Sequence, residues 1–209
     1  MPTEKFINLS TRKQRMILEA MRDEFLMRPY AQITVSRLIR RAGISRASFY
    51  TYFDGKDDMF STMLKTLAGD MEGLLEEAFR RCGGIFCDSM EYVFYLLVEN
   101  DAGRMYSRVY KHIADDEGCR SAFARVKQAY YREERWRDRG KACFKALDRP
   151  RYPGLDEDGL SCAVDMGMAI IDKAVLLWFD RCSEPEKLGE AVRAQLRILE
   201  QGIRRKEED

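Results

Sequence analysis

Apolar residues recur at helical spacing along most of the chain, and no segment alternates in the manner of a β-strand. The first such segment is predicted to begin at Ser10 or Thr11 and to end at Pro29. Thr11 and Gln14 have the spacing of a capping box, in which a hydroxyl and an amide each satisfy an unpaired backbone N–H. One apolar face of this helix combines Met16, Ile17, Ala20, Met21 and Phe25.

Two short helices follow at close spacing. One is predicted over Thr34–Ala42 and the next over Ser45–Tyr52, and each starts at a hydroxyl residue that can cap it. Gly43 lies between them and permits a sharp reversal of the chain. The Asp54-Gly55 pair ends the third helix, and a fourth helix is predicted from about Lys56 to Arg81.

The remaining pattern is also helical. Helices are predicted over about 85–100, from residue 101 onward, over about 119–148, and over two long final stretches, about 157–182 and 184–206. The segments 82–84 and 148–159 are interpreted as loops. The predicted fold class is therefore all-α, with three helices first, then a long helix and a further series of helices.

Charge is distributed unevenly between the head and the body. The net charge of the 209 residues is +1, yet residues 1–53 carry ten lysines and arginines against four acids. Such an asymmetry indicates an anion-binding head on a mildly acidic body. No stretch approaches the ~20 apolar residues of a membrane span, and the N-terminus lacks the apolar segment of a signal peptide. We therefore expect a cytoplasmic protein without a membrane partner.

The spacing of the second and third helices is that of a helix-turn-helix, whose second helix enters the major groove of DNA. Arg46, Ala47 and Ser48 open that helix and would face base edges. An arginine can donate two hydrogen bonds to guanine, which is worth about 1–3 kcal/mol of discrimination, and an alanine can contact a thymine methyl group.

The aromatic residues of the segment ISRASFYTYFDGK (residues 44–56) divide into two groups. Phe49 and Phe53 have no polar tip and are predicted to be core. Tyr50 and Tyr52 can direct their hydroxyls to phosphates, and Lys56 can add its charge to the positive end of the fourth helix. The predicted DNA contacts are Thr34, Arg37, Ser45, Arg46, Ala47, Ser48, Tyr50, Tyr52 and Lys56.

The segment ITVSRLIRRAGISRASFYTYFDGKDDMF (residues 33–60) resembles the DNA-binding segment of the TetR family of bacterial transcription regulators. The resemblance covers roughly the first 60 residues, and it departs from the family at Ile39, where many members have alanine. It implies that a three-helix head, a helix-turn-helix domain over 1–55, is joined by a long helix to a larger helical body, a ligand-binding and dimerisation domain over 56–209. It also implies a homodimer, a palindromic double-stranded operator, and repression that a small-molecule effector relieves. The last two helices would form a four-helix dimer bundle.

The body offers candidates for an effector pocket and for a dimer face. Aromatic and apolar residues in the middle of the chain either form the core or line a pocket, since small-molecule sites are mostly apolar. The predicted pocket residues are Phe94, Met105, Tyr106, Tyr110, His112, Phe123, Tyr130 and Trp178. The predicted dimer face is Ala163, Gly167, Ile170, Ala174, Val192, Leu196 and Leu199, for which the alternative is burial within one chain.

The sequence supports no catalytic set, cofactor or metal site. It has one histidine, no C-x-x-C pair and no glycine-rich phosphate loop. The six cysteines are expected to be reduced, buried thiols, although a thiol switch or a protein partner remains an alternative to a small ligand. The expected function is that of a ligand-released DNA-binding repressor, with no enzyme activity.

Overall fold

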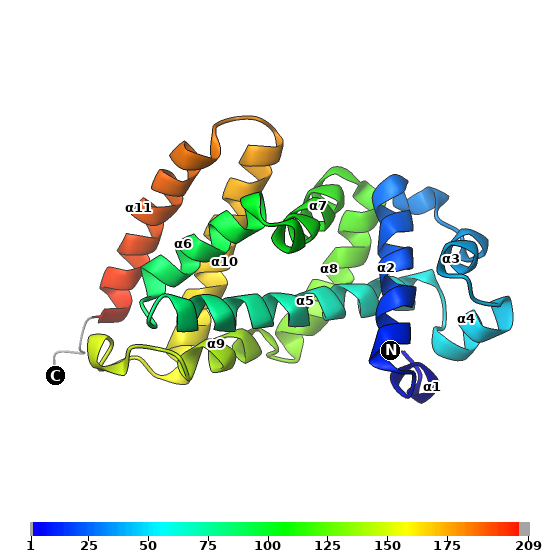
Figure 1. Ribbon diagram of the computed structural model, residues 1–209, viewed down its shortest axis with the longest axis horizontal. Coiled ribbons are helices and arrows are strands. Elements are labelled where there is room, and N and C mark those ends of the chain that lie inside the picture. Colours follow the sequence, from blue (N-terminus) through cyan, green and yellow to red (C-terminus); the bar gives the residue numbers. More distant parts are fainter. Residues whose placement is uncertain (1, 205–209) are drawn as a thin grey trace. The chain divides into compact units, whose positions relative to one another are not determined.

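The fold comes from a computed structural model that describes residues 2–204, without the side chain of residue 102. Within this range the chain forms eleven α-helices and two short 3-10 helices, and no strand. It divides into two compact units (Figure 1). Unit 1 combines the chain up to Ala68 with His112–Ala129, and unit 2 combines Gly69–Lys111 with the chain from Tyr130 onward. The functional boundary between residues 55 and 56 follows from the family resemblance, and it stays a prediction.

Unit 1 contains the predicted head. Its helices are α1 (Glu4–Ile7), α2 (Thr11–Met27), η1 (Tyr30–Gln32), α3 (Val35–Ala42) and α4 (Arg46–Tyr52), together with the first half of α5 (Lys56–Arg81) and most of α8 (Glu117–Arg132). Its core includes the predicted residues Ile17, Met21, Phe25 and Leu38, all at most 2 % exposed.

The start of α2 differs from the predicted capping box. Ser10 is the N-cap, and its hydroxyl accepts from the backbone N–H of Lys13. The side-chain amide of Gln14 instead donates to the carbonyls of Ile7 and Leu9, at 2.7 and 2.9 Å. Gln14 therefore ties the start of α2 to the turn before it. That turn follows a short helix, Glu4–Ile7, which the sequence did not predict.

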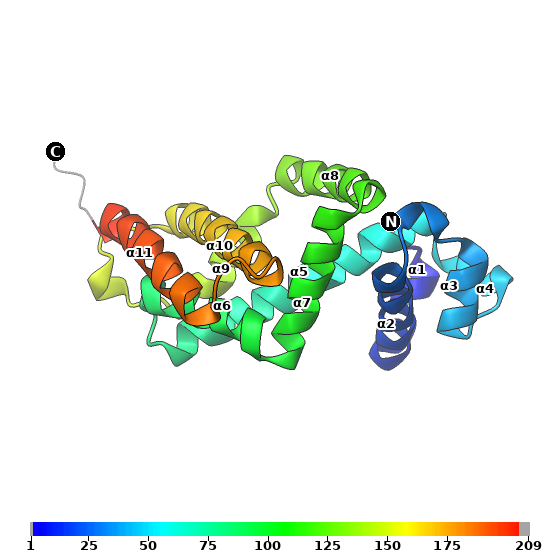
Figure 2. The ribbon, with the colours of Figure 1, turned by 90° about the horizontal axis from the view of Figure 1, so that it is seen from above.

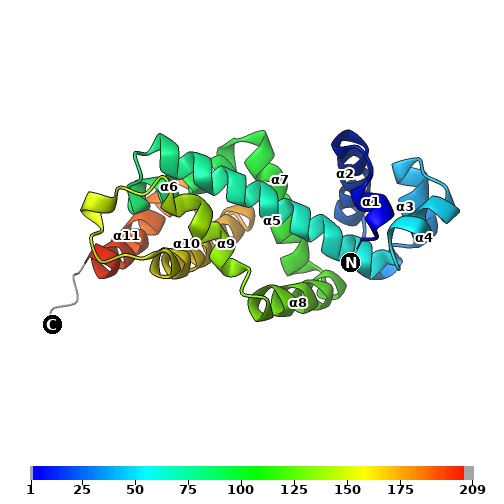
Figure 3. The ribbon, with the colours of Figure 1, turned by 90° about the horizontal axis from the view of Figure 1, so that it is seen from below.

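That short helix, α1, supports α4 (Figure 3). The ring of Phe6 is 3 % exposed and lies 4.8 Å from the ring of Phe53 and 5.8 Å from the ring of Tyr52. The backbone N–H of Thr3 donates to the carbonyl of Tyr52, and its hydroxyl donates to that of Thr51. These contacts satisfy carbonyls at the end of α4 that have no partner within the helix.

Unit 2 contains α6 (Phe86–Glu99), α9 (Trp136–Phe144), η2 (Arg149–Arg151), α10 (Glu157–Phe179) and α11 (Pro185–Arg204), with most of α7 (Asp101–Asp115). The single helix predicted over 119–148 is wrong: α8 and α9 are separate, and Glu134 between them has a φ of +53°. α10 and α11 run side by side and both pack on α6 (Figure 2). The predicted end of the last helix, at about residue 206, lies outside the described residues.

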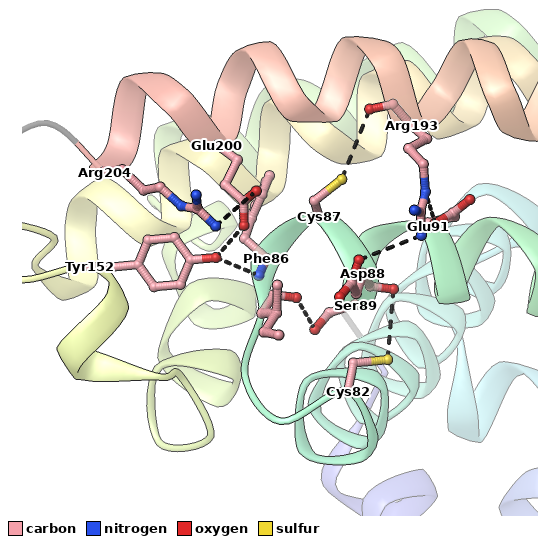
Figure 4. A network of polar contacts seen from close by, with 11 residues as sticks. Cys82, Phe86, Cys87, Asp88, Ser89, Glu91, Tyr152, Arg193, Glu200 and Arg204 are labelled. Atoms are coloured by element: carbon pink, nitrogen blue, oxygen red, sulfur yellow. Dashed lines mark hydrogen bonds and ion pairs between the residues drawn. The ribbon is translucent and has the colours of Figure 1, made fainter.

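A polar network joins α6, α11 and the loop after η2 (Figure 4). The hydroxyl of Tyr152 accepts from the backbone N–H of Phe86 at 2.9 Å and donates to Glu200 at 2.5 Å. Glu200 is itself paired with Arg204, and Arg193 of α11 is paired with Glu91 of α6. The Tyr152 hydroxyl and the Glu200 carboxylate thus both have partners, so the network stabilises the packing of unit 2.

Candidate functional site

α4 and the residues beside it have one polar, exposed face and one buried, apolar face. Ser45, Arg46 and Ala47 are exposed, Tyr50 is 49 % exposed, and Phe49 and Phe53 are 0 % exposed. Ser45 is the N-cap of α4, accepting from the N–H of Ser48 at 2.9 Å, and Thr34 caps α3 in the same way. Gly43 ends α3 at a φ of +62°, the left-handed region that favours glycine. Both caps and the sharp turn agree with the sequence prediction.

Arg46 connects the two helices of this motif. Its guanidinium lies 3.4 Å from the hydroxyl of Ser36 on α3 and 3.4 Å from the hydroxyl of Tyr50 on α4, with its carbon 5.6 Å from the Tyr50 ring. Distances of 3.4 Å are long for hydrogen bonds, so these contacts hold the guanidinium weakly. Arg46 and Tyr50 therefore form one exposed surface from which the guanidinium can turn toward a base.

Three other predicted contacts are less available. Tyr52 is half-buried against Phe6, and Ser48 is half-buried, with its hydroxyl 2.8 Å from that of Ser45. The ammonium of Lys56 donates to the carbonyls of Tyr30 and Ile33, at 2.9 and 3.3 Å, and lies 4.4 Å from the centre of the Tyr30 ring. Lys56 thus holds the turn before α3, and only its third N–H is left for a phosphate.

Tyr30 connects several elements of unit 1 through its ring, its hydroxyl and its backbone N–H. Its ring packs against Phe25 and Phe60, and its hydroxyl donates to the carboxylate of Asp57. Burial, followed by the contact with Asp57, raises the pKa of Tyr30 well above its usual range, so the hydroxyl stays protonated. Its backbone N–H donates to Asp116, whose other oxygen accepts from the N–H of Cys119 at 2.6 Å at the start of α8. This connection could not be predicted from sequence patterns, because its partners are up to 86 residues apart.

The predicted pocket residues do not form one group. Phe94 is 0 % exposed in the core of unit 2, and Trp178 packs against that core with its ring 4.7 Å from Phe179. His112 and Phe123 belong to unit 1, and Met105 is half-buried on α7. The rings of Tyr106 and Tyr110 stack in parallel on α7, with their centres 6.4 Å apart. Tyr130 belongs to unit 2 as well.

A pocket of about 280 Å³ lies elsewhere, in unit 1 between α5 and α8. Its walls include Asp57, Asp58 and Lys65 of α5 and Arg125 of α8, and Arg125 is paired with Asp57 at 3.3 Å. None of the predicted effector contacts lines it. Because both acidic and basic side chains line the pocket, its charge favours neither an anionic nor a cationic ligand.

The structure adds residues to the tyrosine group that the sequence did not single out. The guanidinium of Arg139 on α9 lies 5.5 Å from the centre of the Tyr130 ring. Burial raises the pKa of Tyr106 above its usual range and that of Tyr110 to about 12, and the carboxylate of Asp172 on α10 adds to both shifts. The stacked tyrosines therefore stay neutral beside a charged arginine.

Most of the predicted dimer residues face the interior of their own subunit. Ala163, Ala174, Val192 and Leu196 are at most 5 % exposed, and Gly167 lies against Met90, which a Cβ at that position would meet at 2.8 Å. The small residues of α10 thus accommodate α6 of the same chain, as in the alternative of intrachain burial. Ile170 and Leu199 are half-buried.

The exposed apolar residues of these helices lie on a different stripe. Met166 is 55 % and Ile198 is 70 % exposed. At helical spacing from them, Cys162 and Ala169 on α10 and Ala191 and Ala194 on α11 are exposed as well.

Four of the six thiols are shielded from reaction. Cys87, Cys119 and Cys143 are buried and Cys82 is half-buried, and burial raises the pKa of each. The values reach about 12 for both Cys119 and Cys143. Cys162 and Cys182 are exposed.

No helix in the described part of the chain is long and apolar enough to cross a lipid bilayer.

Comparison with known proteins gives the same interpretation of the head and of the fold. Residues 17–63 match the sequence profile of the bacterial regulatory proteins of the tetR family. A TetR-family transcriptional regulator from Syntrophomonas wolfei is 16 % identical and aligns over 92 % of this chain and 96 % of its own, with a TM-score of 0.61.

Two further solved structures are similar over most of their length. A transcriptional regulator from Rhodococcus sp. Rha1 is 20 % identical, with a TM-score of 0.63 over 92 % of this chain and 98 % of its own. FadR from Bacillus subtilis, solved in complex with stearoyl-CoA, is 19 % identical, with a TM-score of 0.56 over 87 % and 96 %. At these identities the likeness establishes a shared fold.

Proposed function

We propose that the chain is a transcriptional regulator of the TetR family that acts as a sequence-specific DNA-binding repressor, which a small molecule releases from its operator. The observation that carries the proposal is the exposed start of α4. Arg46, Ala47 and Tyr50 stand free of the core that Phe49 and Phe53 seal beneath them. This arrangement suits a helix that lies in the major groove.

The residues divide into two roles at the DNA. Arg46 and Ala47 read base edges, with Arg46 best matched to guanine. Thr34, Arg37 and Ser45 are exposed on the same motif and, with the hydroxyl of Tyr50, they suit contacts to phosphates. Lys56 adds charge near the backbone while it holds the turn before α3.

A homodimer would provide two such helices. We place its face on the exposed stripe of Met166 and Ala169 on α10 and Ala191, Ala194 and Ile198 on α11. Small residues around two large apolar ones let the helices of a second copy approach closely. A two-fold dimer would read a palindromic operator whose half-sites are about 34 Å apart.

Release requires a ligand that binds the free protein more tightly than the DNA-bound protein. α5, α7 and α8 each run from one compact unit into the other, so they are covalent routes by which binding in the body can reach the head. The FadR structure with stearoyl-CoA shows that this fold accommodates a small ligand in another protein.

The test is an electrophoretic mobility shift with duplexes that cover the DNA flanking the protein's own gene. We expect a discrete complex at nanomolar protein in 0.15 M salt, which a subset of small apolar or aromatic compounds dissociates. The matched control is Arg46→Ala, which should weaken the complex without changing the circular dichroism spectrum. Binding that is equal on all duplexes and insensitive to every compound would contradict the proposal.

A further inference from the structure

Asp116 is the single residue between α7, which ends at Asp115, and α8, which begins at Glu117. One oxygen of its carboxylate accepts from the backbone N–H of Cys119 at 2.6 Å, and its backbone carbonyl accepts from that of Arg120 at 2.9 Å. This is the contact pattern of an N-cap, in which an aspartate side chain satisfies an N–H that has no partner within the helix. Asp116 therefore fixes where α8 begins.

The second carboxylate oxygen of Asp116 is bound to the segment that leads into the helix-turn-helix. It accepts from the backbone N–H of Tyr30 at 3.3 Å. Tyr30 opens η1, and Thr34, the cap of α3, follows η1 after Ile33. Desolvation acts to raise the pKa of Asp116, but the hydrogen bonds from Cys119 and Tyr30 lower it below its usual value, so the group accepts as a carboxylate. Hydrogen bonds to an ionised acceptor are stronger than neutral ones.

The start of α8 also lies against Tyr30 by close packing. A Cβ on Gly118 would lie 2.9 Å from the Cβ of Tyr30 and 3.2 Å from the Oδ1 of Asp116. The first of these distances is shorter than a real Cβ contact allows, so a side chain at this position would push the two segments apart. Glycine at residue 118 therefore permits the hydrogen bond between Asp116 and Tyr30.

The start of α5 holds the same segment through other groups. Lys56 donates to the carbonyls of Tyr30 and Ile33, at 2.9 and 3.3 Å. The hydroxyl of Tyr30 donates to Asp57, which is paired with Arg125 of α8 at 3.3 Å. Two helices thus fix the polypeptide before α3, and α8 supplies the contact to the backbone N–H.

We propose that Asp116 is a positioning residue for DNA binding: by holding Tyr30 to the start of α8, it sets the orientation in which α3 and α4 meet the operator. α3 follows directly from the held segment, and the turn at Gly43 joins α3 to α4, so a displacement of Tyr30 carries both helices with it. All the residues in this chain of contacts belong to unit 1. The inference rests on the proposed function, because it takes α4 to bind DNA.

A second capping aspartate provides the matched control. Asp156 caps α10 in the same manner, accepting from the N–H of Gly159 at 2.7 Å, and within the described residues its carboxylate binds nothing beyond that turn. Serine caps helices about as well as aspartate, but its short side chain with one oxygen cannot also reach a second segment. Asp116→Ser and Asp156→Ser therefore both remove one negative charge and keep a cap, and only Asp116→Ser cuts a link to Tyr30.

Operator binding is measured by fluorescence anisotropy on the full chain, at a temperature where circular dichroism shows every variant to be folded. We expect Asp116→Ser to bind about fivefold or more weakly than the wild type, with unchanged salt slope and base preferences, and Asp156→Ser to stay within about twofold. Removal of a negative charge should by itself favour DNA binding, so a loss of affinity reports position rather than charge. Wild-type affinity in Asp116→Ser, or an equal loss in both variants, would overturn the proposal.

Amide hydrogen exchange tests the contact in the absence of DNA. The N–H of Tyr30 should exchange about tenfold or more faster in Asp116→Ser, whereas the amides of Met21 and Phe25 in the core of unit 1 should keep their wild-type rates. Asp156→Ser should leave Tyr30 unchanged. A merely destabilised protein would accelerate all three amides together, and that result, or an unchanged rate at Tyr30, would contradict the inference.

Gly118→Ala is a second variant, which keeps the carboxylate and moves the start of α8 away from Tyr30. Alanine has a higher helix propensity than glycine, so a loss of affinity could not come from a weaker α8. We expect about threefold or more weaker operator binding and faster exchange at Tyr30. Wild-type values of both would also overturn the proposal.

The two proposals fail separately. If the wild type forms no operator complex although Asp116→Ser exposes the amide of Tyr30, the contact stands and the repressor is wrong. If the wild type binds its operator and Asp116→Ser binds equally well, the repressor stands and the positioning role is wrong.

Discussion

At the scale of single residues, the sequence predicts apolar positions better than charged ones. Phe49 and Phe53 are fully buried as expected, because a phenyl ring has no alternative to the core. Lys56 is different, since its partners are backbone carbonyls of Tyr30 and Ile33, which no side-chain pattern reveals. Arg139 was missed because its neighbours Tyr106, Tyr130 and Asp172 come from three other helices, which only the folded chain brings together.

Lys56 has two roles that one substitution can separate. Lys56→Ala removes hydrogen bonds to two carbonyls, and because the side chain is only half-buried we expect a loss of about 1 kcal/mol of unfolding free energy. If the third N–H contacts a phosphate, the slope of log binding constant against log salt also falls by about 0.9. Urea denaturation and salt titrations of operator binding measure the two effects. A loss of stability with an unchanged salt slope would remove Lys56 from the DNA contacts.

Thiol reactivity should follow burial. At pH 8 a thiol with a pKa of about 12 is ionised to only about one part in ten thousand, so Cys119 and Cys143 should resist alkylation. Iodoacetamide labelling followed by peptide mass spectrometry should find Cys162 and Cys182 modified first. Rapid labelling of Cys119 or Cys143 in the folded protein would restore the thiol switch as a competing mechanism at those sites.

At the scale of elements, the long and strongly periodic helices were predicted and the irregular joints were not. α1 has only four residues, too few for a periodic signal. α8 ends in a Schellman motif, in which the N–H of Arg135 donates to the carbonyl of Tyr130 and Glu134 takes the left-handed position. Glycine usually marks that position, so a glutamate there hides the break between α8 and α9.

The contact between α1 and α4 provides a test at this scale. Phe6→Ala leaves a cavity beside Phe53 and Tyr52, and we expect a loss of about 3 kcal/mol of unfolding free energy. DNA binding should weaken equally on all sequences, because α4 loses its support rather than a base contact. Ile7→Ala is the matched control, since Ile7 is 60 % exposed, and it should change stability by less than about 0.5 kcal/mol. Equal effects of the two variants would show that α1 does not support α4.

At the scale of the whole molecule, the sequence predicted a dimer face on α10 and α11 from residues that the subunit itself largely buries. A dimer through these two helices stays a prediction. Apolar residues in α10 and α11 serve both interior and surface, and periodicity alone cannot assign them. Only the exposure of Met166 and Ile198 separates the two sides.

The dimer proposal is tested by charge on that stripe. Ile198→Glu places a carboxylate beside its symmetry mate or a closely packed neighbour, so we expect a monomer in sedimentation at micromolar concentration and at least tenfold weaker operator binding. Arg197→Gln lowers the charge by the same amount on an adjacent face and should stay a dimer. An Ile198→Glu variant that remains dimeric would place the interface elsewhere.

The central claim is that the exposed start of α4 reads DNA sequence through Arg46. The most direct measurement is selection from random duplexes by the wild type and by Arg46→Ala, followed by sequencing of the bound fractions. The account predicts a two-fold symmetric site for the wild type, and a loss of preference for guanine at one position of each half-site in the variant, of about 1–3 kcal/mol. Enrichment of no common site, or of the same site with the same base preferences by both proteins, would contradict it.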